Sequence, residues 1–216
     1  MSQAHASAIE AMPTGIPSGK LGMWLFLVSE VMFFTALIAA YVVLKLGHPS
    51  WPGPEGHLSI PLGTVNTFLL ICSSTTIVLS MAASVGSPST ADTPSPAGMV
   101  PARSQAGRFG SARGWLLATM GLGACFLGIK AVEYSAKFSH HILPSTNVFW
   151  SCYFAMTGLH ALHVLGGIVF NLWILAQTMR PAVWIRKSHF LELGGLYWHF
   201  VDIVWIFLFP LLYLLS

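Results

Sequence analysis

Long apolar runs alternate with short polar breaks along most of this chain. The runs cover residues 20–46, 61–86, 112–137, 148–179 and 190–215. Each run exceeds the ~20 residues that a helix needs to cross about 30 Å of hydrocarbon. Proline and glycine are concentrated in the breaks, where they end helices. The pattern predicts an all-α protein, an integral membrane bundle of five transmembrane helices.

The ends of these runs predict the domain organisation and the orientation in the membrane. We expect residues 1–19 to be a flexible cytoplasmic tail, because they lack the basic region of a signal peptide, and residues 20–216 to form a single five-helix membrane domain. Seven basic residues lie at one predicted end of the bundle: Lys20, Arg103, Arg108, Arg113, Arg180, Arg186 and Lys187. Only Lys45 and Lys137 lie at the other end. The positive-inside rule therefore predicts a cytoplasmic N-terminus, cytoplasmic loops at 87–111 and 180–188, and an outer C-terminus.

The amino-acid composition narrows the class of protein further. Charged residues make up 8% of the chain, against about 25% in soluble domains. The net charge of +3 comes from the predicted cytoplasmic loops and forms no dense basic surface, so a nucleic-acid partner is not expected. Cys72, Cys125 and Cys152 lie in different apolar runs without close pairing, which predicts buried thiols rather than a disulfide or a metal site.

A few ionisable residues interrupt the apolar runs. An ionisable side chain at membrane depth is costly, so it normally faces a partner helix, a cavity or another ionisable group. Glu30 has no acid or base within four residues, and it is expected to be protonated, paired across helices or bound to something polar. Lys130, Glu133 and Lys137 have helical i, i+3 and i, i+4 spacing, which favours an ion-pair cluster near the outer end over a proton-transfer role.

Histidines in the last two runs are candidates for metal ligands. His160 and His163 are three residues apart on one helix face, but no acidic or cysteine ligand accompanies them. Packing or hydrogen bonding between helices is therefore favoured over ligation of a metal or haem. His199 and Asp202 have the same spacing, and a structural pair is favoured over a proton relay. We accordingly assign no catalytic residue and no metal ligand to this chain.

The sequence contains no self-sufficient active site. It lacks a phosphate loop, a glycine-rich dinucleotide fingerprint and a Ser-His-Asp constellation. Small residues are frequent in the apolar runs, and they suit close packing of helices. A membrane subunit that works inside a larger complex is the function that these features predict.

Three segments carry a family resemblance: Trp24 to Phe34, Thr157 to Val164, and Tyr197 to Trp205. They resemble the signature segments of subunit III of the haem-copper cytochrome c oxidases. Residues 61–67 and 131–134 resemble two further segments, and all five runs are covered in order. The five-span form, which occurs in many bacterial oxidases, lacks the first two of the seven helices of the mitochondrial type.

The resemblance implies a non-catalytic subunit of the bacterial inner membrane. Such a subunit packs against catalytic subunit I and other oxidase subunits, stabilises subunit I, holds phospholipid and supports proton uptake. Haem and copper are then expected in partner subunits, and no cofactor except phospholipid in this chain. Glu30 matches the family's carboxylate in the helix that lines the lipid cleft, and Arg180 lies near its basic residue for lipid phosphate. A structural role is implied for Glu133, His160, His163, His199 and Asp202.

Two other functions remain open at this point. In the first, the chain is a membrane haem b anchor in which His160 or His163 ligates iron together with His199. In the second, it is an accessory subunit of a quinol oxidase or a nitric oxide reductase. The sequence contains no docking site for an electron donor that would separate a cytochrome c oxidase from these relatives.

Overall fold

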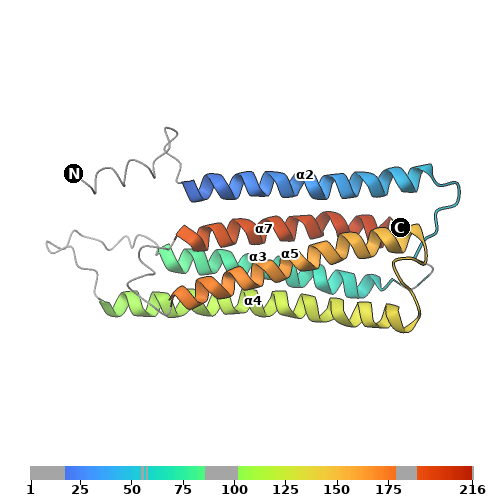
Figure 1. Cartoon of the computed structure of the whole chain (residues 1–216). Helices are drawn as coiled ribbons and strands as arrows, with labels where there is room; N and C mark the ends of the chain where they lie inside the picture. The colour runs from blue at the N-terminus through green and yellow to red at the C-terminus, as the bar shows by residue number, and fades with distance from the viewer. Residues whose placement is uncertain (1–17, 55, 57, 86–101, 179–188, 216) are drawn as a thin grey trace. The chain divides into compact units, whose positions relative to one another are not determined.

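The structure is a computed structural model that describes residues 18–54, 56, 58–85, 102–178 and 189–215. The described residues form five α-helices (Figure 1). A π-helical turn follows the last of them. These elements are α2 (Ser18–Gly47), α3 (Ile60–Val85), α4 (Ala102–Ser139), α5 (Val148–Thr178), α7 (His189–Phe209) and η1 (Pro210–Leu214). Among the described residues, five helices are long and apolar enough to cross a membrane, which confirms the predicted all-α membrane fold.

The chain divides into two compact units, and α2 belongs to the first, which ends at Ser50. The second unit begins at Trp51 and contains the other helices. The prediction of one membrane domain over residues 20–216 stays a prediction, and the tail before Ser18 lies outside the described residues.

Helix α4 is longer than its apolar run predicts. The loop expected at 87–111 is wrong for its second half, because α4 already begins at Ala102. The first turns of α4 contain alanine, arginine and glutamine, which are strong helix formers. The arginines and the glutamine are too polar for hydrocarbon, so the apolar run begins later. Hydropathy locates only the part of the helix suited to the membrane, Gly110–Ser139.

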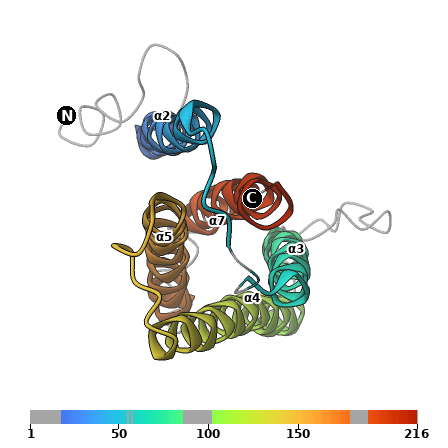
Figure 2. The same cartoon turned by 90° about the vertical axis from the view of Figure 1, so that its right-hand side faces the viewer.

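The four helices of the second unit form a closed ring (Figure 2). α3 contacts α4 and α7, and α5 contacts the same two helices. Two indoles of α7 fix the register against α3: Trp198 donates its Nε1 hydrogen to Ser73 Oγ at 2.9 Å, and Trp205 donates to Thr67 Oγ1 at 3.0 Å. Both indole rings are almost fully buried. The core of this unit therefore lies inside the ring, with α7 supplying its largest side chains.

The last α-helix ends before its apolar run does. Proline lacks a backbone N–H and its ring clashes with the preceding helical turn, so an α-helix does not continue undisturbed through Pro210. The chain instead forms η1, closed by a hydrogen bond from Leu215 N–H to the carbonyl of Pro210 at 2.9 Å. The predicted span of 190–215 agrees with the candidate span Phe190–Leu214, and only the type of helix changes at Pro210. Within η1, Tyr213 is buried and points into the bundle.

Helix α4 ends in a Schellman motif. The N–H of Ile142 bonds the carbonyl of Lys137 at 2.9 Å, and the N–H of His141 bonds that of Phe138 at 3.0 Å. His141 occupies the left-handed position of this motif, with φ of 58°. Glycine is the residue usually found there, because a Cβ makes this conformation costly.

Replacing His141 with glycine should stabilise the chain by about 1 kcal/mol, because it removes the strain of a left-handed non-glycine residue. The His141 side chain is exposed, so little packing is lost. Thermal unfolding of the purified protein measures the effect. His141→Ala is the matched control and should give no gain, because alanine retains the Cβ. Equal stabilisation by both variants would contradict the backbone explanation.

Candidate functional site: buried polar side chains of the helix ring

A cluster of three charged residues lies on one face of α4, inside the ring. Lys130 Nζ is 3.0 Å from Glu133 Oε2, and Lys137 Nζ is 2.8 Å from Glu133 Oε1. Helical spacing of three and four residues places these side chains next to one another. All three side chains are about 4% exposed. The predicted ion-pair cluster is thus confirmed, and it is buried.

Two tyrosines complete this cluster from other elements. The hydroxyl of Tyr153, on α5, donates to Glu133 Oε1 at 2.9 Å, and that of Tyr213, in η1, approaches the same oxygen at 2.8 Å. Lys130 Nζ donates to the hydroxyl of Tyr213 at 2.5 Å and lies 4.7 Å from the ring centre of Trp205. The cluster therefore joins α4, α5 and the end of α7.

Sequence reasoning did not identify the two tyrosines. Their positions in apolar runs were a usable signal, since a buried phenolic hydroxyl normally has a polar partner. Which partner it has depends on the packing of the helices. The carboxylate of Glu133 thus bonds two lysines of its own helix, one tyrosine of α5 and one of η1.

The two histidines of α5 have different surroundings. His160 is 1% exposed, and its ring packs against those of Phe126 and Trp205 at centroid distances of 5.6 and 5.2 Å. His163 Nδ1 is instead 2.8 Å from the carbonyl of Leu159, in its own helix. One ring is therefore part of the aromatic core, while the other is held by its own backbone.

His199 and Asp202 do not form the expected pair. His199 Nδ1 is 2.7 Å from Ser74 Oγ on α3. Neither carboxylate oxygen of Asp202 has a hydrogen bond within 3.5 Å to a described residue, and the residue is 4% exposed. The spacing places both on one face of α7, but the imidazole is turned toward α3. His199 thus connects two helices, as an intramembrane polar residue commonly does.

Asp202→Asn should leave the stability unchanged or raise it by about 1 kcal/mol, because the amide keeps the shape of a buried carboxyl group that has no hydrogen-bond partner within 3.5 Å among the described residues. Chemical or thermal unfolding of the purified subunit measures the change. His199→Asn serves as the comparison within the same helix turn, since it disturbs the contact with Ser74. A loss of more than about 2 kcal/mol in Asp202→Asn would show that the carboxylate charge itself is required.

Two predicted residues, Glu30 and Arg180, are not part of the described helices of the second unit. Glu30 lies near the middle of α2, where the helical spacing places it on one face with Leu27 and Phe34. Arg180 lies outside the described residues.

No group of three or more histidine, cysteine, aspartate or glutamate side chains gathers closely enough for a metal among the residues that the structure describes. The three cysteines are unbridged, but Cys125 is exposed rather than buried. Hydropathy cannot distinguish a core-facing position of a membrane helix from a lipid-facing one.

The fold and these interior contacts define an all-helical, multi-pass membrane protein. Residues 6–216 match the family model described as cytochrome c oxidase subunit III. Cytochrome c oxidase subunit 3 of Thermostichus vulcanus is 36% identical over 218 residues, which cover 100% of this chain and 96% of that protein. The chain therefore belongs to the cytochrome c oxidase subunit III family, and it is part of a respiratory oxidase complex.

Two further relatives are named as subunits of oxidases that use quinols. Cytochrome bo(3) ubiquinol oxidase subunit 3 of Pseudomonas aeruginosa is 31% identical over 197 residues, covering 90% of this chain and 84% of the relative. Quinol oxidase subunit 3 of Bacillus subtilis is 31% identical over 199 residues, covering 91% and 86%. The relatives of this chain therefore include subunits of both cytochrome c oxidases and quinol oxidases.

Proposed function

We propose that this chain stabilises catalytic subunit I of a haem-copper oxidase, holds phospholipid and supports proton uptake without an active site of its own. The proposal is supported mainly by the hydrogen bonds and ion pairs that polar side chains form inside the helix ring. Glu133 accepts from two lysines and two tyrosines, and the indoles of α7 donate to hydroxyls of α3. Side chains committed to contacts between helices support a scaffold rather than a reaction centre.

The proposed location is the inner membrane of a bacterium, with a cytoplasmic N-terminus and an outer C-terminus. The uneven distribution of basic residues supports this orientation. Haem and copper belong to partner subunits in this proposal.

Glu30 and Arg180 are proposed to support lipid binding and proton uptake. A carboxylate within an apolar helix is expensive and is normally retained for a specific contact. Glu30 is the acidic residue of α2, the helix of the first unit.

A subunit of a quinol oxidase is the second candidate, favoured by the similarity to subunit 3 of two quinol oxidases. Purification of the complex with its catalytic subunit, followed by turnover with reduced cytochrome c and with a quinol, decides between the two donors.

Removing this subunit from the purified complex should leave the haem spectrum intact, slow proton uptake and shorten the catalytic lifetime. The reason is that the scaffold supports subunit I without ligating its cofactors. Absorbance spectra and the number of turnovers before inactivation are compared with and without the subunit. The absorbance spectrum of the isolated subunit provides the control. A Soret band there, or haem loss in proportion to the subunit, would support a haem b anchor with His160, His163 or His199 as ligands and contradict the proposal.

A further inference from the structure

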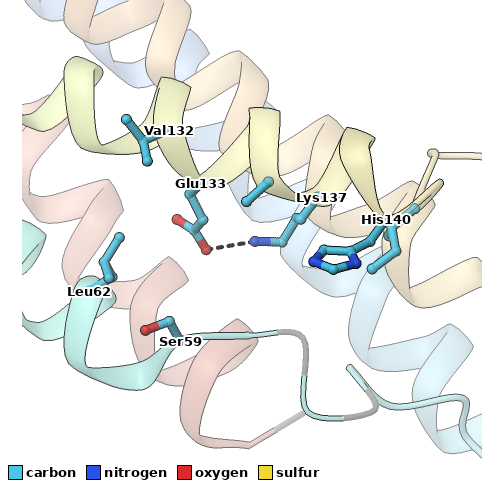
Figure 3. A pocket seen from close by; sticks show the side chains of 8 residues that line it. Ser59, Leu62, Val132, Glu133, Lys137 and His140 are labelled. Atoms are coloured by element: carbon cyan, nitrogen blue, oxygen red, sulfur yellow. Dashed lines mark hydrogen bonds and ion pairs between the residues drawn. The ribbon is translucent and has the colours of Figure 1, made fainter.

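A cavity of about 350 Å³ opens between the start of α3 and the end of α4 (Figure 3). Its apolar wall includes Leu62, Ala136 and Ile142. Ile142 belongs to the Schellman motif that ends α4, so the helix cap itself builds one side of the cavity. The volume is in the range of small-molecule sites. The polar side of the cavity is formed by the outer part of the charged cluster.

The lysines of the cluster differ in how many of their N–H donors are used. A lysine ammonium has three donors. Lys130 uses them on Glu133, Tyr153 and Tyr213. Among the described residues, Lys137 makes one hydrogen bond, to Glu133 Oε1, although its side chain is only about 4% exposed. Its ammonium also lies 4.9 Å from the ring centre of Tyr153 and 5.6 Å from that of Trp150, contacts that leave its other N–H donors without an oxygen acceptor. Lys137 lines the cavity, so an occupant can accept from its remaining donors.

The charges of the cluster do not balance. Two ammonium groups face one carboxylate, and that carboxylate already accepts from two lysines and two tyrosines. The cluster therefore carries one excess positive charge at the cavity wall. A buried positive charge of this kind requires a counter-charge or strong acceptors.

We propose that this cavity binds a phosphate group, with Lys137 as its charged donor. The hydroxyl of Ser59 and the ring of His140 lie on the same cavity and add polar groups within its lining. Phosphate oxygens are strong acceptors for a lysine ammonium. Glu133 does not repel the anion strongly, because its own charge is neutralised within the cluster.

Exposed apolar side chains beside the cavity favour a phospholipid as the source of this phosphate. Val132 lines the cavity and is 64% exposed, and Phe138 and Leu143 nearby are exposed as well. Lys137 lies two residues before the end of the candidate span Gly110–Ser139, at the level where lipid headgroups meet the hydrocarbon. A headgroup phosphate can thus occupy the polar side while acyl chains follow the apolar surface of α3 and α4.

The test counts phospholipids that remain on the subunit within the purified oxidase. The delipidated complex is titrated with dioleoylphosphatidylglycerol, and bound lipid is measured by native mass spectrometry. Lys137→Met should lose one tightly bound lipid per subunit, with at least a tenfold weaker affinity at that site. Ala136→Phe should lose the same lipid by filling the cavity while leaving the ion pairs in place. Lys45→Met, another lysine in the last turn of a membrane helix, is the matched control and should retain it.

Two further probes identify what is bound. Dioleoylglycerol lacks the phosphate and should not restore the lost binding; equal binding would overturn the phosphate assignment. Inorganic phosphate should not compete at millimolar concentration; strong competition without lipid binding would show a free-anion site and overturn the lipid source. Unchanged lipid counts in both Lys137→Met and Ala136→Phe would overturn the site itself. These outcomes concern lipid occupancy at one cavity and not turnover, so they leave the proposed stabilisation of subunit I to be tested separately by removal of the subunit.

Discussion

Replacing Glu133 with leucine is expected to destabilise the folded chain by about 3–5 kcal/mol, because it leaves two lysines buried without their counter-charge. The carboxylate is the common acceptor of Lys130, Lys137, Tyr153 and Tyr213. Its loss therefore releases contacts of α4 with both α5 and η1. Equilibrium unfolding in a detergent and denaturant series, together with incorporation into the oxidase complex, measures the effect.

Two control variants separate the charge imbalance from general damage. Glu192→Leu changes an exposed acid in the first turn of α7 and should cost less than about 1 kcal/mol. The triple variant Lys130→Met, Glu133→Leu, Lys137→Met removes the whole cluster, and it should recover much of the lost stability because no unpaired charge remains. If the triple variant were as unstable as Glu133→Leu alone, buried charge would not be the cause.

Truncation of Trp198 to alanine should cost about 3–5 kcal/mol, the usual range for removing a large aromatic side chain from a core. Trp198 is 1% exposed and contacts three other helices. A Cβ on Gly123 of α4 would be 2.7 Å from its ring, and one on Gly167 of α5 would be 2.9 Å away. With Nε1 bonded to Ser73 of α3, the indole is held between the three helices. Thermal unfolding of Trp198→Ala measures the loss.

Exposed and uncrowded positions provide the controls for this prediction. Trp173→Ala removes the same side chain from a residue that is 38% exposed, and it should be much milder. Gly123→Ala should destabilise because the methyl group meets a ring that cannot move away. Gly121→Ala, on the same helix, meets nothing within 4 Å and should be neutral or slightly stabilising. Equal changes in stability at both glycines would contradict the close packing of Trp198 against Gly123.

The helix pattern and the charged cluster were both predictable because each depends on local spacing. An apolar run of the right length has few alternatives in a membrane, since every backbone polar group must be bonded within the segment. Lys130, Glu133 and Lys137 belong to one helix, and their separation alone brings the charges together. The start of α4 at Ala102 was missed because hydropathy does not detect a helix that extends into water.

Contacts between helices could not be predicted in the same way. Membrane helices associate through packing detail and not through a difference in hydropathy, so sequence does not indicate which faces meet. His199 bonds Ser74 and not Asp202, although spacing alone would permit either. Tyr213 bonds Glu133 from the π-helical turn that begins at Pro210, a change of helix type that hydropathy does not indicate.

The sequence by itself determined the number of membrane helices, their approximate ends, the ion-pair cluster of α4 and the family resemblance. These features follow from residue order within single segments, where helical geometry leaves few choices. Only the tertiary structure decided the partners of Trp198, Tyr153 and Tyr213, and the cavity beside Lys137. Those features depend on which faces of different helices meet, and that is set by the mutual fit of side chains such as Trp198 between Gly123 and Gly167.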